Sequence, residues 1–360
     1  MIEVGAVGPK GAHEWNTLVK ESLHTGFYHL WEWGEVLFST YGHRRYYLVA
    51  KRNGDLIGAF PLIYVKSILF GNRLISLPFC EYGGPFVHRA LSSEEKAQVI
   101  DKLLSATGRL ATSLGVKYVE IRGPSSKVAV DILRNRGYAG FQRYVTFRIN
   151  LADPVEVLWR NLDRKTRNTT KRAMKREVEV VQAKKVEQLK AYYALYLELQ
   201  KRHGSPPHAF ALFQNLFEAF HRKGRMKIML AEYRGEPIAG NMTFHWSKMI
   251  YWSGSVTDIE HRHFNPTNLL VWKTIEYESE DGNKLFDLGR TRTNTGIHHF
   301  KKGWGGKETK LSDYMRFSRN VKMPPDPSQR KYEFLSKFWS LIPVSASSRL
   351  GPRIISGLAL

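Results

Sequence analysis

The chain has 360 residues, 42% of them hydrophobic and 12% aromatic, which excludes an intrinsically disordered protein and suits two domains better than one. Its formal net charge of +22 at pH 7 predicts an anionic partner: nucleic acid, acidic lipid headgroups or a phosphate-bearing substrate. The single cysteine, Cys80, excludes an intramolecular disulfide and a cysteine-based metal site, and is typical of a reducing compartment.

The first residues, MIEVGAVGPKGAHEW, lack a basic stretch followed by an apolar core, so we expect no signal peptide. No apolar run approaches 18 residues, so we expect no membrane-spanning helix either. These features predict a cytoplasmic protein.

Two segments of the chain repeat in the same order. Residues 48–58 (LVAKRNGDLIG) align with 229–239 (MLAEYRGEPIA), and both read as a strand, a tight turn with glycine and a second strand. Later in each half a strand ends on an acid, in 115–120 (GVKYVE) and in 282–287 (GNKLFD). The order of these matches predicts a duplicated α/β unit.

Between the two parts of the first repeat lies a loop of unusual composition, within residues 73–85 (RLISLPFCEYGGP). The rigid Pro78 is followed by the permissive pair Gly83 and Gly84. Glycines allow backbone amides to approach a ligand, which makes Tyr82, Gly83 and Gly84 candidates for substrate binding. A plain turn would explain the same residues equally well.

The second half opens on a strongly basic stretch. Residues 159–176 contain eight lysines or arginines and one aspartate, with a helical spacing of apolar and threonine residues. As one helix, this segment would align Lys165, Arg167 and Arg172 on an exposed stripe able to follow phosphates. A merely solvated basic face is the alternative.

Two further helical regions follow the basic stretch. Residues 186–224 indicate two helices joined at Gly-Ser-Pro-Pro, whose apolar faces we assign to packing. The turn at 261–268 (HRHFNPTN) leads into an apolar helix that Pro266 begins and that Asn265 or Thr267 would cap. Asn268 then falls at the start of that helix.

The most informative stretch is 282–306, GNKLFDLGRTRTNTGIHHFKKGWGG. A short strand ends at Asp287 and is followed by Arg290, and a polar loop then carries Lys301, Lys302 and Trp304 into a glycine-rich turn. Cations beside a strand end suit the binding and polarisation of an anionic or carbonyl substrate. Lysines that are simply solvated are the alternative, and one of His298 and His299 could line the same cleft as a proton acceptor.

The chain closes on a basic and aromatic tail after the proline-rich residues 323–327. Pro343 and Pro352 are expected to cut it into short pieces. A tail of this kind can lie on an anionic membrane face or pack back onto the protein, and both readings stay open.

These motifs resemble the FemAB-like aminoacyl- and acyltransferases. The resemblance rests on Asp287 to Arg290 with Lys301 to Gly305 (family pattern fDfGRS…FKxxWG), on the basic helix after Lys165, on the SLPF.dYGGP-like loop before Pro85, and on Gly-Ser-Pro-Pro in place of the family's GTP turn. In the basic helix, Thr170 and Glu177 depart from the family's aliphatic residue and glycine. The resemblance implies an α/β fold of two tandem GNAT-like units, at 1–150 and 151–320, followed by a tail at 321–360.

The family also implies a reaction, the transfer of an aminoacyl group from tRNA, or of another acyl group, to an amine of a cell-envelope precursor. It places Lys301, then Lys302, beside the developing oxyanion, with Asp287 as an orienting residue. Arg290, Lys165, Arg167, Arg172, Tyr82, Gly83, Gly84, Asn268 and Trp304 would bind substrates. The family implies no metal and no cofactor, only a donor substrate, aminoacyl-tRNA or acyl-CoA.

The turn at 261–268 bears on the identity of the donor. GNAT enzymes that use acyl-CoA bind its diphosphate with a Q/R-x-x-G-x-G/A turn, and no glycine occurs in this one. Its absence favours aminoacyl-tRNA, with an acyl-CoA-dependent N-acyltransferase of polysaccharide or lipid synthesis as the alternative. A noncatalytic RNA-binding protein is the alternative of another class. Lipid-linked acceptors in the family would suit peripheral contact with the inner face of an anionic membrane.

Overall fold

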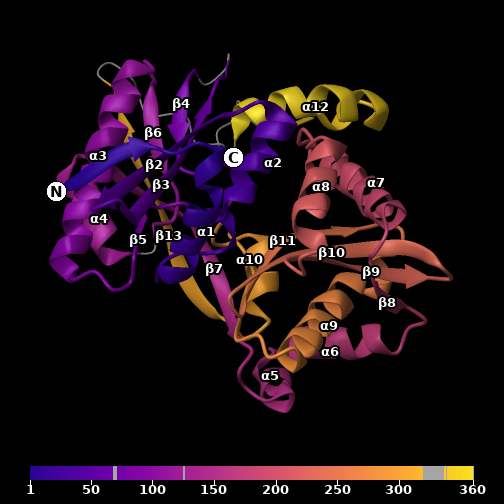
Figure 1. Cartoon of the computed structure of the whole chain (residues 1–360). Coiled ribbons are helices and arrows are strands. Elements are labelled where there is room, and N and C mark those ends of the chain that lie inside the picture. The colour runs from indigo at the N-terminus through magenta and orange to yellow at the C-terminus, as the bar shows by residue number, and fades with distance from the viewer. Residues whose placement is uncertain (68–70, 125, 319–335, 338, 360) are drawn as a thin grey trace. The chain divides into compact units, whose positions relative to one another are not determined.

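The computed structural model describes residues 1–67, 71–124, 126–318, 336–337 and 339–359 (Figure 1). The chain divides into two compact units. The first unit comprises Met1–Arg143, Leu311–Asp326 and Arg353–Leu360, and the second Tyr144–Lys310 and Pro327–Pro352. Both units are thus discontinuous in sequence, whereas the predicted division at 150 and 320 was linear.

The first unit is an α/β unit whose sheet has helices on both faces. On one face of the sheet, Trp15 of the first helix stacks on Tyr47. The next residue along the strand, Leu48, points to the opposite face and packs in the core beneath the third helix. Its elements are, in chain order, β1 (Ile2–Ala6), α1 (Ala12–Glu21), α2 (Trp31–Tyr41), β2 (Arg44–Arg52), β3 (Asp55–Val65), β4 (Arg73–Ile75), β5 (Phe86–Val87), α3 (Ser93–Ser113), β6 (Tyr118–Ile121), α4 (Lys127–Asn135) and the start of β7 (Ala139–Asn150).

The second unit repeats this plan. Helix α7 contacts β10 and β11, and α9 contacts the same strands from the other face, where α6 packs beside it (Figure 1). Its elements are the rest of β7, then α5 (Val155–Asn161), α6 (Arg164–Met174), β8 (Glu179–Gln182), α7 (Val186–Arg202), α8 (Phe210–Leu216), β9 (Met226–Tyr233), β10 (Glu236–Trp246), β11 (Met249–Thr257), α9 (Pro266–Glu280), β12 (Leu285–Asp287), α10 (Gly296–Lys302) and the start of β13 (Lys307–Phe317).

The predicted internal duplication is confirmed in detail. The hairpins β2–β3 and β9–β10 turn at Asn53–Gly54 and at Arg234–Gly235, and all four of these residues have positive φ. That geometry is the type I′ turn, whose twist matches the flanking strands. Gly115 and Gly282, which precede β6 and β12, are both in the left-handed region as well. Each half therefore contains the same hairpin and the same helix-to-strand connection.

The two units exchange strands, since each contains one strand from the other half of the sequence. In the first unit the strand order is β1-β2-β3-β4-β6-β13, with β5 paired to β3, so this unit includes a strand from the second half of the sequence. In the second unit the order is β7-β12-β11-β10-β9-β8, which begins with a strand from the first half. This exchange is what makes both units discontinuous.

The basic stretch forms two helices rather than the single predicted helix. Helix α5 ends before Leu162, and Asp163 begins α6 by accepting a hydrogen bond from the Thr166 amide at 2.6 Å. An aspartate in this position satisfies an amide that the helix itself leaves without a partner. Thr166, Thr170 and Ala173 form the buried face of α6, which leaves its basic residues on the outside.

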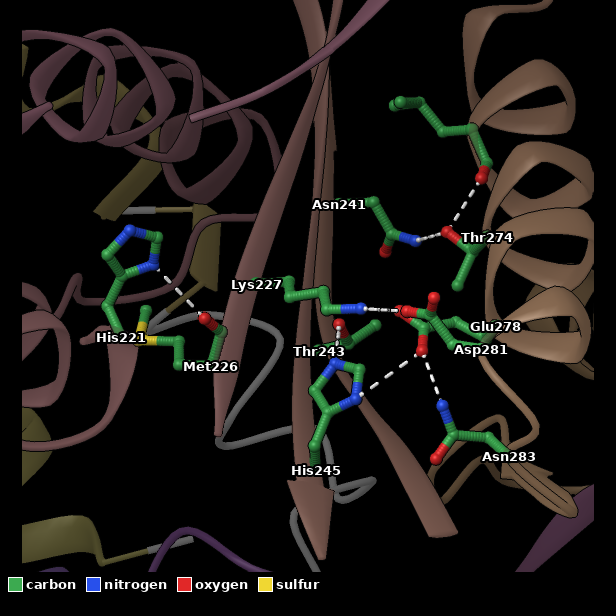
Figure 2. A network of polar contacts seen from close by, with 11 residues as sticks. His221, Met226, Lys227, Asn241, Thr243, His245, Thr274, Glu278, Asp281 and Asn283 are labelled. Atoms are coloured by element: carbon green, nitrogen blue, oxygen red, sulfur yellow. Dashed lines mark hydrogen bonds and ion pairs between the residues drawn. The ribbon is translucent and has the colours of Figure 1, made fainter. Parts of the chain in front are cut away.

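A buried polar network fixes the carboxyl-terminal end of α9 to the sheet (Figure 2). The Lys227 ammonium, on β9, lies 2.9 Å from carboxylate oxygens of both Glu278 and Asp281. Glu278 also accepts a hydrogen bond from Asn283 at 2.8 Å and lies 3.6 Å from the ring of His245, on β10. This network anchors the carboxyl-terminal end of α9, and a contact of 2.6 Å between the hydroxyls of Thr267 and Thr257 joins its amino-terminal end to β11.

The tail differs from its prediction. Residues Val344–Leu358 form one helix, α12, with Pro352 inside it, so the prolines do not cut the tail into short pieces. Gly351 packs against Pro207, and the carbonyl of Ser336 lies close to Gly204. Leu341, Leu350 and Ile354 remain exposed. The tail therefore packs in part onto the protein and keeps an apolar surface, so a contact with membrane stays a prediction.

Over the described residues, none of the helices combines the length and the apolar character needed to cross a membrane.

Candidate active site

A cavity of about 650 Å³ opens in the second unit. Its walls come from β11, from the amino-terminal end of α9, from α10, and from the carboxyl-terminal end of α7. The lining residues are Leu199, Arg202, His203, Trp252, Ser253, Gly254, Ser255, Thr257, Asp258, Ile259, Arg262, Asn265, Pro266, Thr267, Asn268, Leu288, Gly296, Ile297, Phe300 and Lys301. Of the residues predicted from the sequence, Lys301 and Asn268 are brought together here.

Lys301 is 8% exposed and anchored at the cavity wall. Its ammonium donates hydrogen bonds to the carbonyls of Gly289 at 2.9 Å and Arg290 at 3.1 Å, and lies 5.6 Å from the ring centroid of Trp252. The strand end predicted from Asp287 to Arg290 thus positions the predicted lysine. The lysine itself lies in helix α10, capped by Thr295, and not on the predicted loop.

Asp287 is 1% exposed and does not line the cavity. Its carboxylate accepts hydrogen bonds from Arg148 Nε at 3.1 Å and from the Gly289 amide at 2.9 Å, and it also contacts the Thr146 hydroxyl. Through Gly289, the aspartate fixes the backbone that holds Lys301. The orienting role of Asp287 in the reaction stays a prediction.

The glycines after Lys301 permit close packing between α10 and the α5–α6 corner. The Gly303 carbonyl accepts a hydrogen bond from the Asp163 amide at 2.9 Å, and a Cβ at Gly303 would lie 2.2 Å from the Thr166 hydroxyl. Gly305, with φ of +74°, lies against the Asn161 carbonyl in the same way. Trp304 is 1% exposed within the apolar core, so it supports this corner and does not line the cavity.

The sequence did not indicate the β11 wall of the cavity. The register between β10 and β11 shifts by one residue at this wall. Met242 pairs with Gly254 and Thr243 with Trp252, which leaves Ser253 as an extra, unpaired residue. Such a bulge bends a strand and redirects its side chains, and bulges are common next to active sites. The Trp252 indole donates to the Gly254 carbonyl at 3.2 Å, which holds its ring beside Lys301. In the sequence, the Ser-Gly-Ser run at 253–255 was the feature that could have indicated this bulge.

The opposite end of the cavity favours negative charge. Pro266, Thr267 and Asn268 form the amino-terminal end of α9, whose first turn carries no acidic residue, and Arg202 and Arg262 lie around it. A helix amino terminus attracts anions through its amides and dipole. Asn265 precedes the helix with φ of +55°, the left-handed conformation for which glycine is usual. Asparagine therefore permits a tight turn directly before α9 although the segment has no glycine.

Asp258 is the acidic residue among the cavity-lining positions. Burial alone would raise the pKa of its carboxyl, but the hydrogen bond with His261 at 2.5 Å helps to lower it. Nearby His203 has a pKa below its usual value, because burial and the charge of Arg202 disfavour the imidazolium. Asp258 is thus ionised and His203 neutral at pH 7.

The other predicted residues lie outside the cavity lining. Lys165 and Arg172 are exposed on α6, and Arg167 is half-buried and donates to the Arg160 carbonyl at 3.2 Å. Lys302 is exposed, and the guanidinium of Arg290 lies 5.0 Å from the Tyr144 ring. His298 is buried within 3.3 Å of Glu308, and neither it nor His299 lines the cavity.

The loop residues Tyr82, Gly83 and Gly84 belong to the first unit. All three are buried, and the Gly83 amide already donates to the Arg122 carbonyl at 2.9 Å. The Gly84 carbonyl lies 3.3 Å from the His29 ring. These contacts fit a structural turn, and their predicted part in substrate binding stays a prediction. Among the described residues, no group of three or more His, Cys, Asp or Glu side chains is arranged to hold a metal ion.

Comparison with known proteins supports this description. Residues 160–302 match the family profile "Acetyltransferase (GNAT) domain". No curated protein matches the sequence. Among solved structures, FemX shares the fold with a TM-score of 0.70 at 16% identity, over 88% of this chain and 97% of that one.

Two further structures have the same fold at lower similarity. A tandem GNAT protein from the clavulanic acid biosynthesis pathway gives a TM-score of 0.58 at 12% identity, over 89% of this chain and all of that one. The carboxyl-terminal domain of a lysylphosphatidylglycerol synthetase from Agrobacterium fabrum gives 0.58 at 11% identity, over 85% and 91%. The chain therefore has the tandem GNAT fold that FemX also has, and its residues 160–302 match a GNAT acetyltransferase domain.

Proposed function

We propose that this protein transfers an aminoacyl group from tRNA to an amine of a cell-envelope precursor and forms an amide. One observation supports this most: a single cavity connects an anion-attracting helix terminus, at Pro266 to Asn268, with an ammonium group fixed beside a strand end, at Lys301. A phosphate-bearing donor matches the first end, and an activated carbonyl matches the second.

In this mechanism the acceptor amine attacks the carbonyl carbon of the donor. A C–N bond forms, the C–O bond to the tRNA ribose breaks, and the proton lost by the amine passes to the leaving oxygen. The Lys301 ammonium stabilises the negative charge that develops on the carbonyl oxygen. Because the Gly289 and Arg290 carbonyls hold this ammonium, the charge is already in position and needs little reorganisation.

The aminoacyl-tRNA donor is supported by the position of the basic helix. Helix α6 begins against Gly303, two residues after Lys301, so its exposed basic face lies on the element that packs against the turn following the reactive lysine. Lys165 and Arg172 on that face can contact RNA phosphates outside the cavity. A tRNA is much larger than the cavity and would contact both the cavity and the basic face of α6.

An acyl-CoA donor is the second candidate. The match of residues 160–302 to an acetyltransferase domain favours this donor. Asn265 in the left-handed conformation permits a tight turn before α9 although the segment has no glycine. The chemistry at Lys301 would be the same, with a thiolate as the leaving group.

One assay separates these donors. The full chain is incubated with charged tRNA or with acyl-CoA, together with candidate lipid-linked and nucleotide-linked amine acceptors, and products are identified by mass spectrometry. We expect an acceptor to gain the mass of an amino-acid residue from charged tRNA. A gain only from acyl-CoA would establish the second candidate. RNA binding without any product would favour the noncatalytic RNA-binding protein.

Neutralising the basic face of α6 tests the proposed contact with RNA. Arg167→Ala combined with Arg172→Ala should weaken tRNA binding, and each lost phosphate contact should reduce the slope of log affinity against log salt by about 0.7 to 0.9. Filter binding at several salt concentrations measures the slope. The matched control is Lys184→Ala with Lys190→Ala, which removes the same charge from exposed positions outside α6. Equal slopes in both double variants would make the α6 face merely solvated.

We also propose that the protein is located in the cytoplasm, where it makes peripheral contact with the inner face of an anionic membrane. The exposed Leu341, Leu350 and Ile354, together with the exposed Arg349 and Arg353, support such a contact.

A further inference from the structure

Two buried arginines lie side by side on one face of the sheet of the first unit. Arg73, on β4, is 3% exposed, and Arg122, directly after β6, is 2% exposed. Arg73 pairs with Tyr118 and Ile75 with Glu120, so Arg73, Tyr118, Glu120 and Arg122 project from the same face.

Main-chain carbonyls of the tail cover these arginines. Arg73 donates hydrogen bonds to the carbonyl of Leu358 at 3.1 Å and to that of Gly357, and Arg122 donates to the carbonyl of Ala359. The side chains of this segment contribute nothing to these bonds. The arginines therefore recognise a peptide main chain, irrespective of its sequence.

The site has binding capacity that the tail does not use. In the described part of the chain, Nη1 of Arg122 and Nε2 of His43 are buried without a hydrogen-bond partner. Burial and the charge of Arg73 lower the pKa of His43 to about 4. Its ring is therefore neutral and adds no positive charge to that of the two arginines. Buried polar atoms without partners are rare and costly, which indicates a ligand group larger than one carbonyl.

The geometry of the free donor, and not the net charge, indicates what that ligand group is, because the carboxylates of Glu120 and Asp313 already act on Arg122. Glu120 pairs with Arg122 at 2.9 Å, and Asp313 accepts a hydrogen bond from the Gly123 amide at 3.2 Å. A guanidinium binds a carboxylate through two parallel charge-assisted hydrogen bonds, each about twice as strong as a hydrogen bond between two neutral groups. A carboxylate at the position of the Ala359 carbonyl would provide a second oxygen, which could accept a hydrogen bond from Nη1 of Arg122.

We propose that Arg73 and Arg122 form a binding site for the terminal carboxylate and last carbonyls of a peptide, which residues 357–359 occupy in this structure and can vacate. The site is independent of the proposed transferase activity, since all its residues belong to the first unit. The competing explanation is that the arginines only cap the last carbonyls of α12, a common role for arginine at a helix carboxyl terminus.

The test uses the chain truncated after Pro352 and a fluorescent hexapeptide, IISGLA, which corresponds to residues 354–359. Fluorescence anisotropy should show saturable binding, at least tenfold tighter for the free carboxylate than for the amidated peptide. Arg122→Met should abolish that preference, and Arg134→Met, at an exposed position on α4, should preserve it. Equal affinities of the two peptides, or no binding to a chain with a cooperative melt, would overturn the proposal.

A second measurement on the full chain covers the case in which the truncated chain does not fold. Bound tail protects the bond after the exposed Arg353 from trypsin, so millimolar IISGLA with a free carboxylate should accelerate cleavage there severalfold. The amidated peptide should have much less effect. A cleavage rate that neither peptide changes would mean that the tail is a fixed cap, and the proposal fails.

Discussion

Replacing Lys301 by methionine should lower turnover about a hundredfold or more, which corresponds to on the order of 3 kcal/mol of transition-state stabilisation. Methionine keeps much of the side-chain length and removes the charge beside the developing oxyanion. Substrate affinity should change much less than turnover, because the ammonium acts mainly on the charge of the transition state. The rate constant and KM of the transfer reaction measure the two effects separately.

The contacts of Lys301 add a second effect that the sequence did not suggest. The variant removes the hydrogen bonds from Lys301 to the Gly289 and Arg290 carbonyls, of which the first keeps its contact with the Thr146 hydroxyl at 3.1 Å, at a cost of about 1 to 3 kcal/mol in the free energy of unfolding. Activity must therefore be measured well below the melting temperature of the variant.

The matched control is Lys302→Met, which removes the same charge from an exposed neighbour on α10. It should retain turnover within a few-fold. If Lys302→Met loses as much turnover as Lys301→Met, or if Lys301→Met keeps normal turnover in the folded protein, the oxyanion does not form beside Lys301.

The duplication and the central lysine could be predicted because their signals are local. An Asn-Gly pair between two strand-like runs favours a type I′ hairpin, Arg-Gly occupies the same place in the second half, and both hairpins are present. The helix break at Asp163 was also local, since aspartate three residues before a threonine is a recognisable cap. Its signal was outweighed by the helical spacing on either side.

The strand exchange and the cavity wall could not be predicted in this way. Strand β13 pairs with β6, almost two hundred residues earlier, and no feature of either strand specifies that partner. The bulge at Ser253 likewise results from the register between β10 and β11, which is a property of the pair and not of one strand. Long-range pairing therefore determined both the discontinuous units and the position of Trp252 beside Lys301.

Replacing Lys227 by methionine should reduce the free energy of unfolding by about 3 to 5 kcal/mol, because it leaves the carboxylate of Glu278 buried without its cation (Figure 2). Glu278 is 3% exposed, so water cannot replace the lost ion pair. Chemical denaturation of the variant and the parent protein measures the difference. The control, Lys284→Met, changes an exposed lysine in the same unit and should cost less than about 0.5 kcal/mol.

The cost of Lys227→Met should also depend on pH, and the sign follows from the two titrating neighbours. Burial raises the pKa of Glu278 above its usual value although the charge of Lys227 opposes the shift, so removing that charge should raise it further. Burial and Lys227 together lower the pKa of His245 to about 3, and the variant relieves the second effect.

A group whose pKa is higher in the folded state than in the unfolded state binds protons preferentially when folded, so acid favours folding at that group. The difference in unfolding free energy between parent and variant should therefore be largest near pH 8 and shrink as pH falls toward the unfolded glutamate pKa of about 4.3. Comparing the two proteins at each pH cancels the titration of the groups that do not contact Lys227; Asp281, which does contact it, is a further carboxylate that loses its cation in the variant. A difference that stays constant from pH 8 to pH 5 would mean that Glu278 is ionised and stabilised by partners other than Lys227, and that this lysine does not anchor α9.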